Sequence, residues 1–228
     1  MIREILSGSF DWIGFLMRIP IVLIALSVHE CAHGYAAYKM GDPTAKAFGR
    51  LSLNPLKHLD LFGTLAMLLC GFGWAKPVPV NARRFNNPKW GMAITAAAGP
   101  ISNLLLSLLG VIGMAVTYVV FHYIPANGQF AENLFYVTLL FFEMFHILNL
   151  GLAVFNLFPV PPLDGSRLAL VFLPDRLYFA IMKYEQIIQL VLMLALFSGF
   201  LNGPLNAVIS FISNGMIEVI FFLVGFLV

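Results

Sequence analysis

Residues 20–40 read PIVLIALSVHECAHGYAAYKM, an apolar run with His29, Glu30 and His33 near its middle. About 20 mostly apolar residues are enough for a helix to cross the hydrocarbon core of a bilayer. At about 1.5 Å per residue, His29 would lie ~14–15 Å from each end of such a span. Ionisable groups at that depth are costly and are usually functional. This stretch therefore predicts a membrane helix with a site inside it.

The composition of the whole chain supports a membrane protein. Of 228 residues, 60% are hydrophobic and 11% are charged, and the mean hydropathy is +0.89. A soluble domain carries about 25% charged residues, and its interior is too small to bury so many apolar side chains. The net charge of +2 predicts no nucleic-acid partner, and two cysteines give no disulfide framework.

Further apolar stretches set the expected number of spans. Residues 92–120 and 133–158 are each long enough to cross, and the tail at 187–228 is predicted to hold two more spans, with 202–204 (Asn-Gly-Pro) as the turn. Residues 61–72 are apolar, but a helix of that length spans only ~18 Å, which predicts a re-entrant or half-depth element. We therefore expect an all-α polytopic membrane protein with about five transmembrane helices.

The chain shows no separate soluble module, so residues 1–228 are expected to form one integral membrane domain. Its core would span about 20–170, followed by the C-terminal helical pair at 187–228. Lys and Arg gather in three loops, which are 39–60, 74–90 and 159–186. Under the positive-inside rule these loops are cytoplasmic, which makes the protein multi-pass in the cell membrane. The N-terminus would then lie outside and, after five spans, the C-terminus inside.

Residues 73–81 alternate and contain β-branched side chains, which suggests an extended strand. Pro77 and Pro79 confine such a strand to an edge, because proline has no N–H to donate. Residues 47–53 are a plausible partner, so we expect a small membrane-associated β-hairpin. A Pro-rich interfacial loop is an equally good interpretation of the same residues.

The pattern His29-Glu30-Cys31-Ala32-His33 carries the chemistry. Residues four apart share one helix face, so both imidazoles can bind one metal ion. Glu30 lies one residue along and can reach a metal-bound water instead of ligating. That division suits hydrolysis, because zinc lowers the pKa of its water toward ~7 and the glutamate removes the proton. The alternative is a pair of structural histidines in a helix.

A third ligand has to come from elsewhere in the chain, and Asp164 is the best acid. It follows a Pro-rich segment at 159–162 that ends the preceding helix. Irregular backbone at membrane depth is tolerated where it lines an enclosed or wet cavity, so Asp164 can turn back toward the imidazoles. A plain cytoplasmic turn is the competing interpretation.

Other polar residues allow alternatives. Glu143 and His146 form a second Glu-x-x-His, and two such pairs are half of a di-iron carboxylate site, which would indicate a membrane oxidoreductase. The further carboxylates that it needs would have to be Asp164 and Glu218. A metal-ion transporter is a third class. We expect Glu143 and His146 to pair with each other or face a polar groove. We expect Cys31 to pack near the metal, with thiolate ligation as the alternative, and His58 to lie at a surface or an interface.

Three motifs in order resemble the site-2 protease family, zinc metalloproteases that cut within the membrane. They are the His29–His33 pattern, the AGPISN run at 98–103, and Asn156 followed by Leu163-Asp164-Gly165. The runs GDPTAK at 41–46, LNP at 53–55 and KPVPVN at 76–81 are similar to the short bacterial branch, which has neither a PDZ nor a nucleotide-sensing domain. The resemblance covers about 20–170.

The resemblance implies one Zn²⁺ per chain, held by His29, His33 and Asp164, with Glu30 as general base. It implies that Asn156 binds substrate or stabilises the oxyanion, and that Gly99, Pro100 and Asn103 shape close helix contacts. The segment that would hold substrate by strand addition comprises Pro77, Val78, Pro79, Val80 and Asn81. The implied substrate is a transmembrane protein or peptide in the lipid bilayer.

Overall fold

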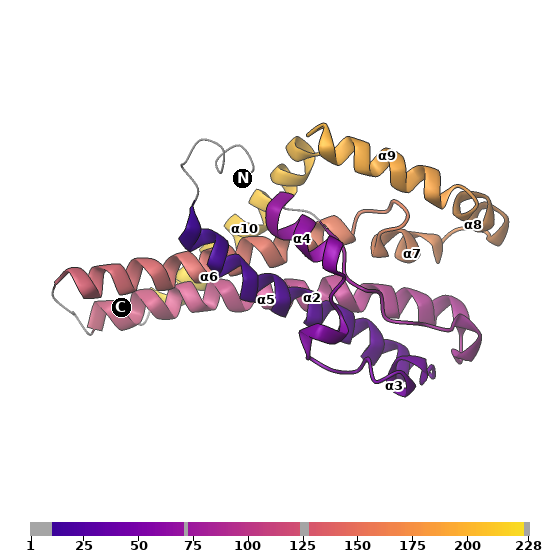
Figure 1. The fold of residues 1–228 in the computed structure, drawn as a ribbon, viewed down its shortest axis with the longest axis horizontal. Helices are drawn as coiled ribbons and strands as arrows, with labels where there is room; N and C mark the ends of the chain where they lie inside the picture. The colour runs from indigo at the N-terminus through magenta and orange to yellow at the C-terminus, as the bar shows by residue number, and fades with distance from the viewer. Residues whose placement is uncertain (1–10, 71–72, 124–127, 226–228) are drawn as a thin grey trace.

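The computed structural model describes residues 11–70, 73–123 and 128–225, and all regular structure in these ranges is helical (Figure 1). The helices are α2 (Trp12–Lys39), α3 (Thr44–Ala47), η1 (Pro55–Lys57), α4 (Leu61–Cys70), η2 (Ala82–Arg84), α5 (Pro88–Tyr123), α6 (Gln129–Asn156), α7 (Asp164–Leu170), α8 (Asp175–Met182), α9 (Glu185–Phe197) and α10 (Asn202–Val224).

Four helices are long and apolar enough to cross a membrane, namely α2, α5, α6 and α10. The expectation of five spans is therefore wrong within the described residues. With 13 residues, α9 spans only ~20 Å. The predicted turn is also misplaced: the chain turns before Asn202, at Gly199 with a φ of 75°, and Asn202 begins α10.

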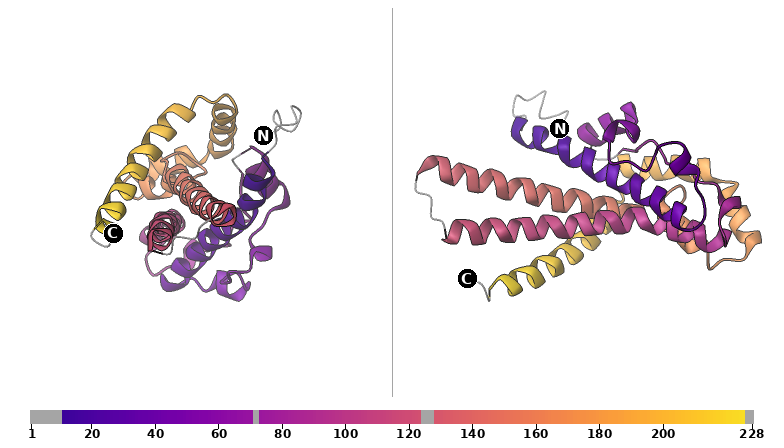
Figure 2. Two further views of the ribbon diagram at one scale, coloured as in Figure 1. Left: turned by 90° about the vertical axis from the view of Figure 1, so that its left-hand side faces the viewer. Right: turned by 90° about the horizontal axis from the view of Figure 1, so that it is seen from below.

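Four spans change the expected topology. In Figure 2 the end of α10 lies toward the same end of the molecule as the last turn of α5 and the first turn of α6. The segments that contain α3, α7 and α8 lie at the opposite end. The end of α10 therefore lies on the opposite side from the basic loops, whereas five spans would have returned it to their side.

The bundle is built around α5, which packs against α2, α6, α7 and α10. Close approach of α5 and α6 depends on Gly110, where an added Cβ would lie 2.8 Å from the backbone nitrogen of His146. The short apolar element is confirmed as the ten-residue α4, which is too short to cross. Met67 of α4 packs on Val22 and Leu26 of α2.

The predicted β-hairpin is wrong, because no strand occurs in the described residues. The segment 73–81 instead bonds to side chains and to a loop carbonyl. Arg50 donates to the carbonyl oxygens of Lys76 (2.5 Å) and Pro77 (3.1 Å), so these groups cannot join a ladder. The prolines at 77 and 79 donate nothing, which leaves too few main-chain groups for strand pairing.

His58 corrects another expectation, because it is fully buried and not at a surface. Its Nε2 bonds to the Ser52 carbonyl oxygen at 2.6 Å, and its own carbonyl oxygen accepts from the Lys76 N–H at 2.8 Å. It therefore joins the loop after α3 to the segment 73–81.

Asp42, fully buried just after α2, holds the far end of this segment. One oxygen accepts from the Asn81 N–H at 2.6 Å, and the other from the N–H (3.0 Å) and hydroxyl of Thr44. Burial raises the pKa of Asp42, but the hydrogen bonds from Asn81 and Thr44 outweigh it, so the pKa lies below its ordinary value. The ionised carboxylate therefore stabilises the fold.

We expect Asp42→Ala to lower the free energy of unfolding by about 1–3 kcal/mol, because buried N–H groups lose their acceptor. The pKa is lower in the folded protein, so this contribution is complete above the ordinary value of 3.8 and is lost as the pH falls below it. Unfolding in detergent is measured between pH 2 and 7. The difference in free energy of unfolding between wild type and Asp42→Ala should shrink at low pH. Glu132→Ala removes an exposed carboxylate, and its difference from wild type in free energy of unfolding should not change with pH in this way.

Candidate metal centre

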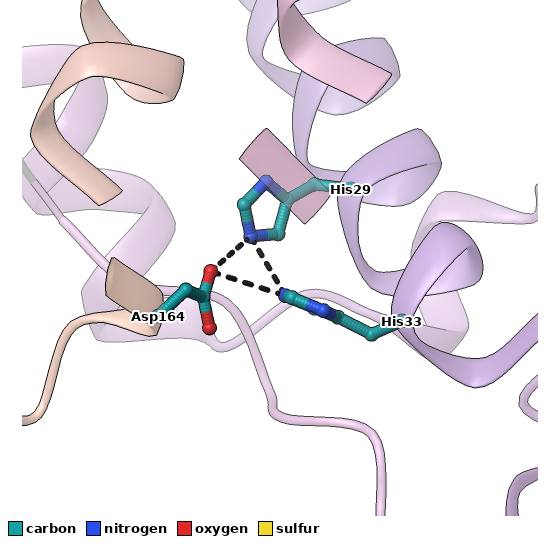
Figure 3. A group of neighbouring side chains, drawn as sticks. All are labelled: His29, His33 and Asp164. Atoms are coloured by element: carbon teal, nitrogen blue, oxygen red, sulfur yellow. Dashed lines mark hydrogen bonds and ion pairs between the residues drawn. The ribbon is translucent and has the colours of Figure 1, made fainter. Parts of the chain in front are cut away.

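Two helices bring the three predicted ligands together, α2 with His29 and His33 and α7 with Asp164 (Figure 3). The two Nε2 atoms lie 3.0 Å apart, and Asp164 Oδ2 lies 3.1 Å from His29 Nε2 and 3.2 Å from His33 Nε2. The side chains of His29 and His33 are 9% and 12% exposed, and that of Asp164 is 21% exposed. The cluster is thus an enclosed meeting point of two helices far apart in sequence.

Local sequence explains each placement. The spacing of four puts both imidazoles on one face of α2. Asp164 is the first residue of α7, after the Pro-rich break. Gly165 permits the return of the chain, because an added Cβ there would lie 2.1 Å from the Leu157 carbonyl oxygen at the end of α6. Only glycine allows so close an approach of backbone to backbone.

The geometry fits one small cation. The two Nε2 atoms and Asp164 Oδ2 form a triangle with edges of 3.0–3.2 Å. An ion near the centre of this triangle would lie about 2 Å from all three atoms, the distance at which zinc binds imidazole nitrogen and carboxylate oxygen. Gly99 of α5 keeps this point open: an added Cβ would lie 2.5 Å from the Nε2 atoms of both His29 and His33. The role of Gly99 is therefore more direct than shaping helix contacts.

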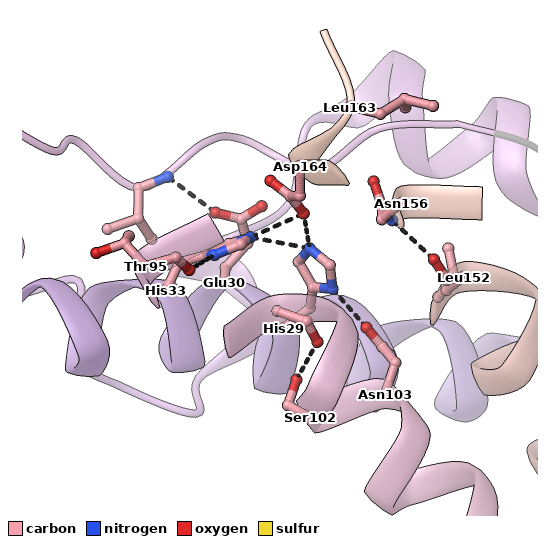
Figure 4. A network of polar contacts seen from close by, with 12 residues as sticks. His29, Glu30, His33, Thr95, Ser102, Asn103, Leu152, Asn156, Leu163 and Asp164 are labelled. Atoms are coloured by element: carbon pink, nitrogen blue, oxygen red, sulfur yellow. Dashed lines mark hydrogen bonds and ion pairs between the residues drawn. The ribbon is translucent and has the colours of Figure 1, made fainter. Parts of the chain in front are cut away.

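The outer nitrogens of both rings are held by α5 (Figure 4). His33 Nδ1 donates to the Thr95 carbonyl oxygen at 2.6 Å. His29 Nδ1 bonds to Asn103 Oδ1. Since an oxygen acceptor requires a proton on Nδ1, each Nε2 keeps its lone pair toward the cluster. This pattern is typical of metal-ligating histidines.

Glu30 stands beside the ligand atoms and is not one of them. Its Oε2 accepts from the Val78 N–H at 2.8 Å, and the residue is 9% exposed. One oxygen is thus fixed by the segment 73–81, and the other keeps its hydrogen-bonding capacity. This arrangement suits a base better than a ligand.

Asp164 faces opposing influences. Burial raises the pKa of the Asp164 carboxyl, but the two facing imidazoles, His29 and His33, lower this pKa by more, so it lies below its ordinary value. The carboxylate is therefore ionised at neutral pH, the state in which it can ligate a cation.

A cavity of about 460 Å³ opens onto the cluster. Its walls include Glu30, Asn156 and, from the predicted substrate segment, Pro77, Val78 and Val80. Pro79 and Asn81 do not line it, and the Asn81 N–H is engaged by Asp42. The Asn156 amide donates to the Leu152 carbonyl oxygen at 3.0 Å, with no hydrogen bond to the cluster (Figure 4).

Sequence reasoning missed several residues at this site. Thr95 acts through its backbone, which leaves no signal in the sequence. Asn149, fully buried in α6, was detectable as a polar residue within an apolar span. Arg167 lines the cavity and lies three residues after Asp164, one helix turn along the same face.

The di-iron alternative gains no support. His29, His33 and Asp164 are the one group of potential metal ligands found in the described residues. Glu143 is exposed, whereas His146 is fully buried between Ser107 and Ser213, so the expected pairing of Glu143 with His146 is not seen. Cys31 is half-buried and lies outside the ligand group.

Comparison with known proteins gives consistent matches. The model of peptidase family M50 matches residues 17–199. A Bacillus subtilis protein named "Putative zinc metalloprotease YwhC" is 45% identical over 148 residues, 64% of this chain and 64% of that protein. A Mycolicibacterium smegmatis protein named "Putative zinc metalloprotease Rip2" is 29% identical over 160 residues, 66% of this chain and 55% of that protein. Each match thus spans less than two thirds of the relative. No solved structure matches the chain.

We expect Gly99→Ala to weaken zinc binding by at least about tenfold, because the new Cβ pushes both rings off the position that a cation needs. Alanine favours helix more than glycine does, so loss of fold is not the expected cause. Competition with a chromophoric chelator in detergent measures the affinity. Gly215→Ala on α10, where nothing lies within 4 Å of an added Cβ, is the control. Equal affinities for the two variants would contradict the assignment.

Proposed function

The chain belongs to peptidase family M50, and from that premise we propose that it is a zinc endopeptidase that hydrolyses peptide bonds in or near transmembrane segments of membrane proteins. The observation that carries the proposal is the triangle of His29, His33 and Asp164 with Glu30 beside it. The catalytic core would be about 20–170, within one membrane protease domain formed by 1–228.

The depth of the cluster supports cleavage below the membrane surface. His29 lies ten residues before Lys39, the last residue of α2, or ~15 Å along the helix axis. Water and peptide can meet there only in a cavity enclosed by protein, and the one lined by the cluster residues and by Glu30 supplies it. The basic loops would face the cytoplasm, at the end of α2 nearer to the site.

Zinc, when bound, supplies a Lewis acid that polarises the scissile carbonyl and lowers the pKa of the attacking water toward ~7. Glu30 would take the proton from that water. Its Oε2 is held by the Val78 N–H, so Oε1 is presented at a fixed orientation. A positioned base of this kind contributes about 10²–10⁴ in rate.

Asn156 would act on the substrate from the wall of the cavity. One amide proton is engaged by the Leu152 carbonyl oxygen, which leaves the second proton as a donor. Donors aimed at the developing oxyanion stabilise the transition state of acyl transfer. Asn156 would hold the substrate carbonyl or its oxyanion.

The segment 77–81 would bind the substrate in extended form, although it is not part of a β-sheet. Peptide bonds in a helix are shielded by their own hydrogen bonds, so the substrate has to unwind locally before attack. The N–H and carbonyl of Val80 have no hydrogen-bond partner among the described residues, and Val80 lines the cavity. Val80 is therefore the member best placed to pair with a substrate backbone.

We expect Glu30→Gln to reduce cleavage of a tagged membrane peptide in detergent by about 10²–10⁴-fold while the zinc content stays the same. The glutamine oxygen can still accept from Val78, but glutamine cannot take a proton. Glu143→Gln, an exposed acid on α6, is the matched control and should cleave like wild type. Cleavage by Glu30→Gln at the wild-type rate would overturn the assignment of the base.

Elemental analysis should find one zinc per chain, and a chelator should stop cleavage until zinc is restored. Two iron atoms per chain would instead indicate the oxidoreductase. Movement of zinc into liposomes that persists in Glu30→Gln would indicate the transporter.

A further inference from the structure

The orientation of His29 depends on an amide that lies entirely inside the bundle. His29 Nδ1 contacts Oδ1 of Asn103 on α5 (Figure 4). Asn103 has no exposed surface, and neither has Asn149 on α6. A buried asparagine can present either its oxygen or its NH₂ group to a ring nitrogen, and the two choices have opposite consequences. Facing the NH₂ group, His29 would have to accept at Nδ1, which puts the ring proton on Nε2.

Neighbouring groups decide which way the Asn103 amide points. Its Nδ2 donates to Asn149 Oδ1 at 2.9 Å, with the Ala25 carbonyl oxygen at 3.4 Å. The Asn149 Nδ2 in turn donates to the Phe145 carbonyl oxygen at 2.9 Å. Because a carbonyl oxygen can only accept, it fixes the NH₂ group of Asn149. Asn149 then offers its oxygen to Asn103, and Asn103 offers its oxygen to His29.

We propose that Asn103 and Asn149 are positioning residues for the metal centre, a two-amide relay that holds the Nδ1 proton on His29 and keeps its Nε2 lone pair available. This inference rests on the zinc site of the proposed function. His33 reaches the same state through the Thr95 backbone carbonyl alone. His29 needs the relay, because a side-chain amide has no fixed polarity until something fixes it.

The rival explanation is that the two asparagines only join α5 to α6. The chain provides a direct comparison for that explanation, because a second buried polar contact joins the same helices. His146 Nδ1 lies 2.8 Å from Ser107 Oγ, and Ser107 and His146 are both fully buried. Neither residue contacts the metal cluster. A role in helix packing would be shared by both contacts, whereas a role in metal binding belongs to the asparagines.

The test measures zinc affinity by chelator competition in detergent, with the full chain. Asn149→Leu removes the nearer acceptor of Asn103 Nδ2 and leaves only the Ala25 carbonyl oxygen at 3.4 Å. It should weaken zinc binding by about 10–100-fold, the usual effect of losing an outer-shell partner. In Asn149→Asp, a neutral carboxylic acid can both donate to the Phe145 carbonyl oxygen and accept from Asn103. The zinc affinity of this variant should therefore stay within about threefold of wild type. Ser107→Ala should also bind like wild type, because His146 keeps the Ser107 carbonyl oxygen at 3.1 Å.

Wild-type affinity in folded Asn149→Leu would overturn the relay, and so would an equal loss in Ser107→Ala. These failures are distinct from failure of the proposed function, in which the wild-type protein itself would bind no zinc. Should Asn149→Leu not fold, Asn103→Asp and Asn103→Leu decide the matter. The aspartate can only accept from His29 and should retain zinc, whereas an equal loss in both variants would overturn the proposal.

Discussion

Inside an apolar helical bundle every polar atom needs a partner within the protein, because hydrocarbon offers none. The inward lone pairs of His29, His33 and Asp164 converge within 3.2 Å of one another, an arrangement that makes physical sense around a cation. Much of the surrounding structure serves that convergence. The spacing of α2, the return of the chain after α6 and the outer hydrogen bonds from α5 all aim ligand atoms at one point.

The second constraint concerns the segment between α4 and α5. Arg50, Asp42 and the loop around His58 hold its backbone, and Glu30 takes the Val78 N–H. The proposed base and the proposed substrate edge are thus joined by one hydrogen bond. A change in the position of Val78 would move the carboxylate that it holds, so binding and proton transfer share one element.

Sequence alone identified which side chains the structure brings together at the cluster, but it was less accurate for the fold around them. The spacing of His29 and His33 determines a common helix face. Asp164 followed from the Pro-rich break before it and from the family resemblance, and the match to peptidase family M50 confirms the family. The three membrane-spanning helices between residues 12 and 156 were predictable from the length of their apolar runs. The tail misled the span count because residues 187–228 are mostly apolar, and the turn depends on the backbone of Gly199. The predicted strand at 73–81 was wrong because an alternating sequence pattern cannot reveal that Arg50 would occupy the carbonyl oxygens of Lys76 and Pro77.

Gly165 makes the cluster sensitive to a single added atom in the backbone region that carries Asp164. The Leu157 carbonyl oxygen occupies the space that any larger residue would need, at 2.1 Å from an ideal Cβ. Most sites tolerate graded substitution and lose performance by degrees. Here one additional carbon would push apart the two backbone segments that deliver the Asp164 carboxylate, so even the smallest side chain would move this carboxylate away from the two imidazoles.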